Sequence, residues 1–147
     1  MAVDAVLDRL LGQDEFRRGL TLDHTIPARS ARFADFPPAL DHRIAHALAG
    51  RGITRLYTHQ AESVARTLQG QDCVVVTPTA SGKTLCYNLP VLHTVLAEPD
   101  ARALYLFPTK ALAQDQLAEL HGLVGGLNAD IKTYTYDGDT PVSARQA

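Results

Sequence analysis

The sequence contains no tryptophan, one methionine and two cysteines, and it carries no net positive charge. So few cysteines argue against a disulfide-stapled secreted domain, and Cys73 and Cys86 are interpreted as reduced core thiols of a cytoplasmic protein. The formal net charge of −2 excludes a globally basic surface, so any contact with nucleic acid must be local. No apolar run is long enough to span a membrane, and no basic stretch follows Met1 as a signal peptide requires. We therefore expect no membrane partner.

The N-terminal part reads as a helical and irregular arm. The 147 residues, of which 46% are hydrophobic and 20% charged, suit one globular domain with a real core. Apolar residues at helical spacing predict a helix over 3–11, and prolines punctuate an irregular stretch over 13–38. A second helix is expected from Pro38, a good first helical residue, to Gly50 or Gly52. His42 and His46 share a face of that helix; a solvated face is favoured over a metal site because no cysteine pair or further histidine motif accompanies them.

The second half alternates strand and helix patterns, which predicts parallel βαβ units. Strands are expected over 72–77, 101–107 and 131–136, and helices over 58–68, 83–97 and 110–124. Pro90 lies inside one expected helix and should bend it or delay its start. The fold class is therefore α/β, with a parallel sheet and flanking helices.

The stretch 77–84 (TPTASGKT) lies between an expected strand and helix, the context of a phosphate-binding loop. Backbone N–H groups and the helix dipole would face the phosphates of ATP or GTP, and Gly82 would let the backbone pass close to them. Lys83 would reach the β- and γ-phosphates, and the Thr84 hydroxyl would bind Mg²⁺. Thr77 occupies the position where the general pattern has glycine. A plain turn is the alternative.

The sequence lacks the carboxylate that hydrolysis needs to hold Mg²⁺, which usually ends a buried apolar strand. Asp137 follows a strand that alternates polar and apolar residues, so it is a weak candidate. Asp72 and Asp100 precede their strands, at the wrong end of a parallel sheet. Three expected strands are also few for such a sheet. We therefore interpret the chain as the front part of a longer enzyme and expect no appreciable hydrolysis from it alone.

Four stretches resemble motifs of the superfamily 2 DEAD/DEAH-box helicases, in that family's order. TPTASGKT resembles motif I, which often lacks the first glycine, and residues 107–116 (FPTKALAQDQ) resemble motif Ia. Residues 52–60 (GITRLYTHQ) resemble the Q motif, and 136–141 (YDGDTP) resemble a loop that contacts the nucleic-acid backbone. Within the family, the chain looks most like the RecQ-like DExH group of DNA-repair helicases. RNA-directed DEAD-box members usually have proline where this chain has Leu56, which lowers the RNA interpretation without excluding it.

The resemblance implies a nucleotide site built on the Q motif and motif I. Gln60 would hydrogen-bond adenine and so select ATP, because an amide both donates and accepts; a solvated glutamine at a helix start is the alternative. Tyr57 would pack beside the base or fill the core. Phe33 or Phe36 would stack on the adenine face, or pack the arm on the core. The expected nucleotide-binding residues are Tyr57, Gln60, Thr77, Pro78, Thr79, Ala80, Ser81, Gly82, Lys83 and Thr84, with Lys83 and Thr84 as catalytic residues and Thr84 as the Mg²⁺ ligand.

A second set of residues is expected to contact nucleic-acid phosphates. Pro108, Thr109 and Lys110 follow the second expected strand, where a helix start can offer N–H groups and charge. Gly138 would allow close approach of a phosphate, although an ordinary Asp-Gly turn is nearly as good an interpretation. Lys110 as a solvated helix residue is likewise open. Phosphate contacts carry no base information, so binding should tolerate any sequence.

These inferences predict a partial RecA-like domain over residues 52–147, preceded by an arm over residues 1–51. The leading hypothesis is the N-terminal portion of an ATP-dependent DNA helicase that uses ATP and Mg²⁺. Its expected partners are single-stranded or partly duplex DNA and the remainder of the same polypeptide, in the cytoplasm or, in a bacterium, at the nucleoid. The alternatives are an RNA helicase of the same superfamily and a module that binds ATP without hydrolysing it.

Overall fold

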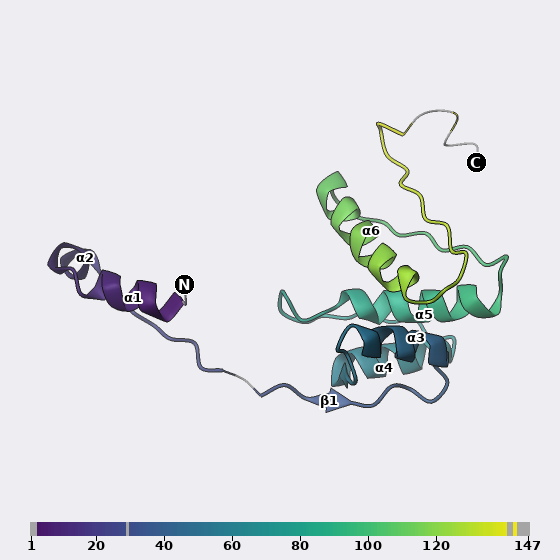
Figure 1. The fold of residues 1–147 in the computed structure, drawn as a ribbon, viewed down its shortest axis with the longest axis horizontal. Helices are drawn as coiled ribbons and strands as arrows, with labels where there is room; N and C mark the ends of the chain where they lie inside the picture. The colour runs from purple at the N-terminus through teal and green to yellow at the C-terminus, as the bar shows by residue number, and fades with distance from the viewer. Residues whose placement is uncertain (1–2, 29, 141–142, 144–147) are drawn as a thin grey trace. The chain divides into compact units, whose positions relative to one another are not determined.

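A computed structural model describes residues 3–28, 30–140 and 143 of the chain (Figure 1). The chain forms two compact units, which divide between residues 30 and 31. Within the described ranges, no helix is both long enough and apolar enough to cross a bilayer. Pro141, which ends the predicted backbone-contacting loop, lies outside the described residues. The functional boundary expected between residues 51 and 52 stays a prediction.

The described part of the first unit, residues 3–28 and 30, contains two short helices. Helix α1 (Val3–Leu11) has the bounds that its apolar period predicts, and none of its residues is buried within the unit. Helix α2 (Asp14–Gly19) corrects the expectation that the chain is irregular from residue 13. Its first turn carries Asp14 and Glu15 and its last turn carries Arg17 and Arg18, charges that suit the two ends of the helix dipole. The sequence prediction missed α2 because this segment has few apolar residues at helical spacing, whereas the charges at its two ends favour a helix.

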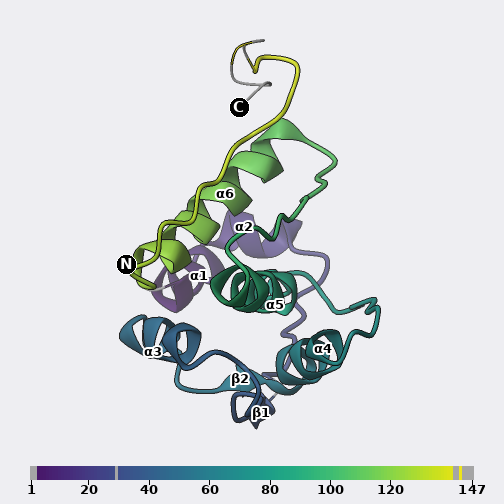
Figure 2. The same cartoon turned by 90° about the vertical axis from the view of Figure 1, so that its right-hand side faces the viewer.

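Among the described residues, the second unit packs four helices and one short antiparallel pair of strands around an aliphatic core. The helices are α3 (His42–Gly50), α4 (Thr58–Leu68), α5 (Thr84–Ala97) and α6 (Lys110–Gly125), and strands β1 (Phe33–Ala34) and β2 (Leu56–Tyr57) pair antiparallel. Helix α5 contacts α3 and α4 and is joined to α6 by hydrogen bonds, and in Figure 2 it lies between α6 and these two helices; α6 also contacts α3 directly. Its central position explains why α5 buries the largest share of its length. The most deeply buried apolar side chains are Ile44, Leu48, Leu56, Val64, Leu89, Leu92 and Leu123, and the polar Asn88 is buried among them.

The helices predicted over 58–68, 83–97 and 110–124 are confirmed as α4, α5 and α6. Helix α5 starts at Thr84 and continues through Pro90, which is buried inside it. Proline has no N–H to donate to the preceding turn. The Thr94 hydroxyl donates to the Pro90 carbonyl at 3.1 Å, so a side chain adds a hydrogen bond just beyond the proline.

Helix α3 begins at His42, four residues later than the predicted start at Pro38. Residues 37–40 form a turn instead, in which the Leu40 N–H donates to the Pro37 carbonyl. Asp41 is the N-cap, and its carboxylate accepts the Arg43 N–H at 2.8 Å. The Arg43 guanidinium also donates to this carboxylate, at 2.6 Å in its shortest contact, and lowers the pKa of Asp41 to about 2. The start of α3 is therefore set by the capping side chain of Asp41 rather than by Pro38.

We expect Asp41→Ala to loosen α3. Loss of an N-cap side chain costs about 1 kcal/mol, so the α3 amides should exchange with solvent about fivefold faster. The folded pKa lies below the ordinary value of 3.8, so the carboxylate stabilises the fold above about pH 4 and loses this effect as the pH falls towards 2. Hydrogen exchange measured by mass spectrometry checks both statements. Asp115→Ala, at an exposed aspartate of α6, is the matched control, and equal exchange in both variants would contradict the prediction.

The structure corrects the three strands expected over 72–77, 101–107 and 131–136: none of these segments forms a strand. Val74 is 92% exposed, Val76 88%, and Leu104 and Leu106 each 83%, where burial in a sheet was expected. Cys73 is exposed as well, whereas Cys86 is buried as predicted. A strand exists only where a neighbour accepts and donates its backbone hydrogen bonds, and two or three strands alone are marginal. The sequence pattern thus identifies segments that are suited to a sheet, but it does not predict whether neighbouring strands are present to pair with them.

Candidate functional site

The loop over residues 77–83 takes the conformation of an anion-binding nest. Ala80 has φ of 58° and Gly82 has φ of 74°, both in the left-handed region. Lys83, next to Gly82, is right-handed helical and caps α5. Alternation of left- and right-handed residues points successive N–H groups in one direction, and the start of α5 adds the positive end of its dipole. This arrangement suits phosphate oxygens, and the assignment of the loop to nucleotide binding stays a prediction.

The Lys83 ammonium folds back over this loop. It donates to the Pro78 carbonyl at 2.8 Å, to the Thr77 carbonyl at 3.0 Å and to the Thr77 and Ser81 hydroxyls, each at 3.3 Å. The two hydroxyls hydrogen-bond each other at 2.6 Å. Four oxygens therefore surround a charge that has three protons to donate. The oxygens of a bound triphosphate would replace some of these loop oxygens as acceptors of the Lys83 protons.

Gln60 joins the start of α4 to the loop. Its Oε1 accepts the Tyr57 N–H at 2.8 Å, and its Nε2 donates to the Gly82 carbonyl at 2.8 Å. The residue is only 4% exposed. A Cβ on Gly82 would lie 2.6 Å from Nε2, so only glycine leaves room for this contact. The two bonds fix which end of the amide is the donor, and the alternative of a solvated glutamine is wrong.

Three rings stack beside this amide. Phe33 stacks on Tyr57 with centroids 5.2 Å apart, across the β1–β2 pair in which these two residues are opposite each other. Tyr57 stacks on His59 at 5.8 Å, and His59 Nε2 lies 3.0 Å from the Ser81 carbonyl. Phe36 packs against the core instead. Phe33, which is 48% exposed, is therefore the upstream aromatic available to a ligand, and His59 is a contact that the sequence analysis missed.

Thr84, the predicted Mg²⁺ ligand, is held by α6. Its hydroxyl donates to Gln116 Oε1 at 3.0 Å, and the Tyr87 hydroxyl donates to the same oxygen. The sequence analysis gave Gln116 no role, although it lies within the stretch that resembles motif Ia. Residues 84 and 116 are separated by 32 positions, so only the packing of α5 against α6 reveals the contact.

The expected phosphate contacts gather at the start of α6. The Thr109 hydroxyl caps the helix by accepting the Leu112 N–H at 3.3 Å. Lys110 pairs with Asp139, which raises the lysine pKa, and its Nζ lies 3.9 Å from the position of a Cβ on Gly138. Pro108 immediately precedes the helix cap and is exposed. The structure thus brings the four predicted residues into one neighbourhood.

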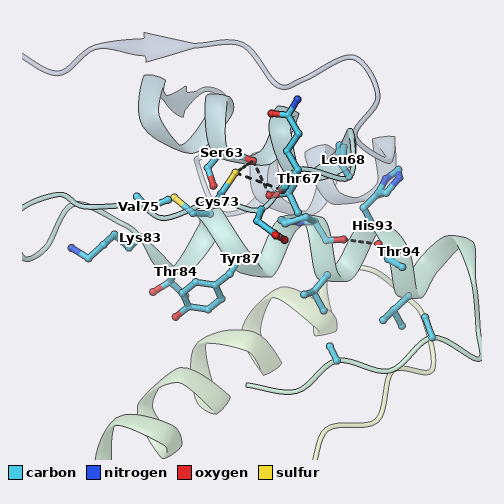
Figure 3. Close-up of a pocket in the computed structure, with 18 of the residues that line it drawn as sticks. Ser63, Thr67, Leu68, Cys73, Val75, Lys83, Thr84, Tyr87, His93 and Thr94 are labelled. Atoms are coloured by element: carbon cyan, nitrogen blue, oxygen red, sulfur yellow. Dashed lines mark hydrogen bonds between the residues drawn. The ribbon is translucent and has the colours of Figure 1, made fainter. Parts of the chain in front are cut away.

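A cavity of about 990 Å³ lies beside α5 (Figure 3), and of the loop over residues 77–83 only Lys83 lines it. Lys83 and Thr84 line one end of it, and His93 and Thr94 line the other. Figure 3 shows Thr84 and Tyr87 pointing from α5 towards α6. The exposed segments 72–77 and 101–107 form part of its wall. The cavity therefore reflects the unpaired segments, and it does not coincide with the loop predicted to bind phosphate.

Comparison with known proteins decides the family. Residues 57–147 match the model of the DEAD/DEAH box helicases. The chain belongs to the DEAD/DEAH box helicase family. The family inferred from the motifs is therefore confirmed, and the matched range includes Gln60, the loop over residues 77–83 and α6.

Two curated helicases illustrate the similarity. An uncharacterized ATP-dependent helicase, YprA, of Bacillus subtilis is 53% identical over 123 residues, which cover 84% of this chain and 16% of that protein. The ATP-dependent helicase hrq1 of Schizosaccharomyces pombe is 30% identical over 99% of the chain and 14% of its own length. The chain therefore spans about one sixth of the relatives that it matches.

A crystal structure of the DUF1998 helicase MrfA bound to DNA and AMPPNP matches 99% of this chain, and the match covers 20% of the MrfA chain. The TM-score is 0.84 and the sequences are 46% identical. A second MrfA crystal structure, bound to DNA, gives a TM-score of 0.82. The expected α/β class, part of a helicase domain preceded by an arm, is confirmed by this agreement.

Proposed function

We propose that the chain forms the nucleotide-binding front part of an ATP-dependent DNA helicase. The observation that carries the proposal is the loop in which Gly82, Lys83 and Thr84 form an anion nest tied to Gln60. Relatives named as ATP-dependent helicases, and an AMPPNP-bound neighbour, support ATP as the ligand. Hydrolysis requires the remainder of the polypeptide, because the sequence offers no strong candidate for the metal-binding carboxylate.

The phosphates would lie against the nest, where Thr77, Pro78, Thr79, Ala80 and Ser81 shape the loop. The Lys83 ammonium would leave part of its contacts with the loop oxygens and take phosphate oxygens instead. The hydroxyl of Thr84 fits a hard cation, since Mg²⁺ takes oxygen ligands and is commonly shared with substrate phosphates. When bound, Mg²⁺ would neutralise charge that develops on the phosphates.

The base would lie near Gln60 and the stacked rings. A glutamine amide has two donor protons and two acceptor lone pairs, and Gln60 uses one of each for Gly82 and Tyr57. The remaining proton and lone pair match adenine N7 and the N6 amino group. Guanine presents an acceptor where adenine has the amino group, so this pairing favours ATP over GTP. Phe33 and Tyr57 offer an exposed aromatic face on which a purine could stack.

Nucleic-acid phosphates would contact the start of α6, where Pro108, Thr109, Lys110 and Gly138 lie together. The N–H groups of the first turn and the charge of Lys110 suit a phosphate. A contact confined to this one place needs no overall positive charge, and the chain has a net charge of −2. An RNA helicase is the second candidate, since the ATP-dependent RNA helicase DBP9 of Candida glabrata is 31% identical over 78% of the chain.

The test is an unwinding assay with the complete polypeptide that contains this chain. We expect ATP-dependent strand separation of a partial DNA duplex, with little separation of the matched RNA duplex, and ATPase activity stimulated by single-stranded DNA. Preference for the RNA duplex would favour the second candidate. Nucleotide binding with no unwinding of either duplex would instead support an ATP-binding module.

A further inference from the structure

One amide oxygen on α6 receives hydrogen bonds from two hydroxyls of α5. Gln116 Oε1 accepts from Thr84 Oγ1 at 3.0 Å and from the Tyr87 hydroxyl. Tyr105 packs edge-on against Tyr87 with centroids 5.8 Å apart, and so restricts the tyrosine ring. Gln116 is half-buried, and the contact therefore lies in a partly shielded place where a hydrogen bond orients its donor well.

The direction of the Thr84 hydrogen bond determines whether the lone pairs of this hydroxyl are available to bind a cation. A hydroxyl has one proton and two lone pairs, and it binds a cation through a lone pair. With its proton committed to Gln116, the hydroxyl turns its lone pairs away from α6. Partners of this kind fix the orientation of metal ligands, and their loss typically costs about 10- to 100-fold in metal affinity.

We propose that Gln116 is a positioning residue that holds the Thr84 hydroxyl with its lone pairs available to the cation of a metal–nucleotide complex. The inference rests on the proposed function, because it assumes that this loop binds ATP with Mg²⁺. It adds a residue of α6 to the nucleotide site, although this helix was assigned only to nucleic-acid contact. Gln116 would act on the cation through its hydrogen bond with Thr84 rather than as a ligand itself.

The test measures the affinity of the complete polypeptide for ATPγS by calorimetry, once with Mg²⁺ and once with EDTA. Gln116→Met keeps the length of the side chain and removes the acceptor. We expect it to weaken binding about tenfold with Mg²⁺ and to leave binding in EDTA within about twofold. Gln116→Asn places its carbonyl one methylene further away and should behave in the same way.

Two further variants separate positioning from packing. Gln116→Glu keeps an oxygen acceptor at the same distance and should retain binding with Mg²⁺. Gln114→Met, at an exposed glutamine of the same helix, is the matched control and should resemble the wild type. Unchanged Mg²⁺-dependent affinity in the Met and Asn variants would overturn the inference, as would an equal loss in EDTA or a loss in the Glu variant. If the wild type bound no ATPγS, the proposed function would fail and the inference with it.

Discussion

Replacement of Lys83 by alanine is expected to lower ATP turnover by the complete polypeptide at least about 100-fold, the usual cost of removing one donor that stabilises developing charge. The ammonium lies within 3.3 Å of four oxygens of the loop against which the phosphates would lie. Alanine supplies neither charge nor donor. No other lysine lies near enough in sequence to replace it, since the remaining two are Lys110 and Lys132.

Steady-state ATPase measurements with and without single-stranded DNA check this expectation. Lys132→Ala is the matched control, because this lysine is exposed and outside the predicted site. The Lys83 variant should remain folded, as judged by circular dichroism, because its ammonium contacts only the loop. Turnover within tenfold of the wild type would refute the phosphate role of Lys83.

Gly82→Ala is expected to weaken ATP binding by about tenfold or more. The backbone there has φ of 74°, where a residue with a Cβ is strained by about 1–3 kcal/mol. The new Cβ would also lie 2.6 Å from Gln60 Nε2, a distance that no real Cβ tolerates, so the amide must move. Both effects disturb the nest and the predicted adenine contact together.

Calorimetry with ATPγS and with GTPγS measures the result, and the preference for the adenine nucleotide should fall as well. Gly125→Ala is the control, because a Cβ there meets nothing within 4 Å and the position is helical. Unaltered affinity and selectivity in the Gly82 variant would show that neither the left-handed backbone nor the amide contact matters for binding.

The sequence predicted helices well where the apolar period and the caps agreed. Residues 3–11 and 58–68 became α1 and α4 with the expected bounds. Helix α3 started late because Asp41 is a stronger cap than the proline at position 38. The strand segments could not be predicted as paired or unpaired, since pairing depends on neighbours and not on the pattern of one segment.

For the candidate site, the sequence identified the residues of the loop but not how they are connected. The Gln60–Gly82 contact joins positions 22 residues apart, and the Thr84–Gln116 contact joins positions 32 apart. Neither spacing follows a local rule. The choice between Phe33 and Phe36 likewise depended on the register of β1 with β2, which turns Phe33 towards Tyr57 and leaves Phe36 to the core.

The ion pair between Lys110 and Asp139 would affect how strongly the chain binds nucleic-acid phosphates. When an unpaired lysine binds a nucleic-acid phosphate, counterions condensed on the strand are released, and this release favours binding at low ionic strength. Lys110 already has a carboxylate beside it, so a phosphate must first displace this built-in competitor. A nucleic-acid phosphate would therefore bind more weakly at Lys110, and dissociate more easily, than at a lysine with no carboxylate beside it.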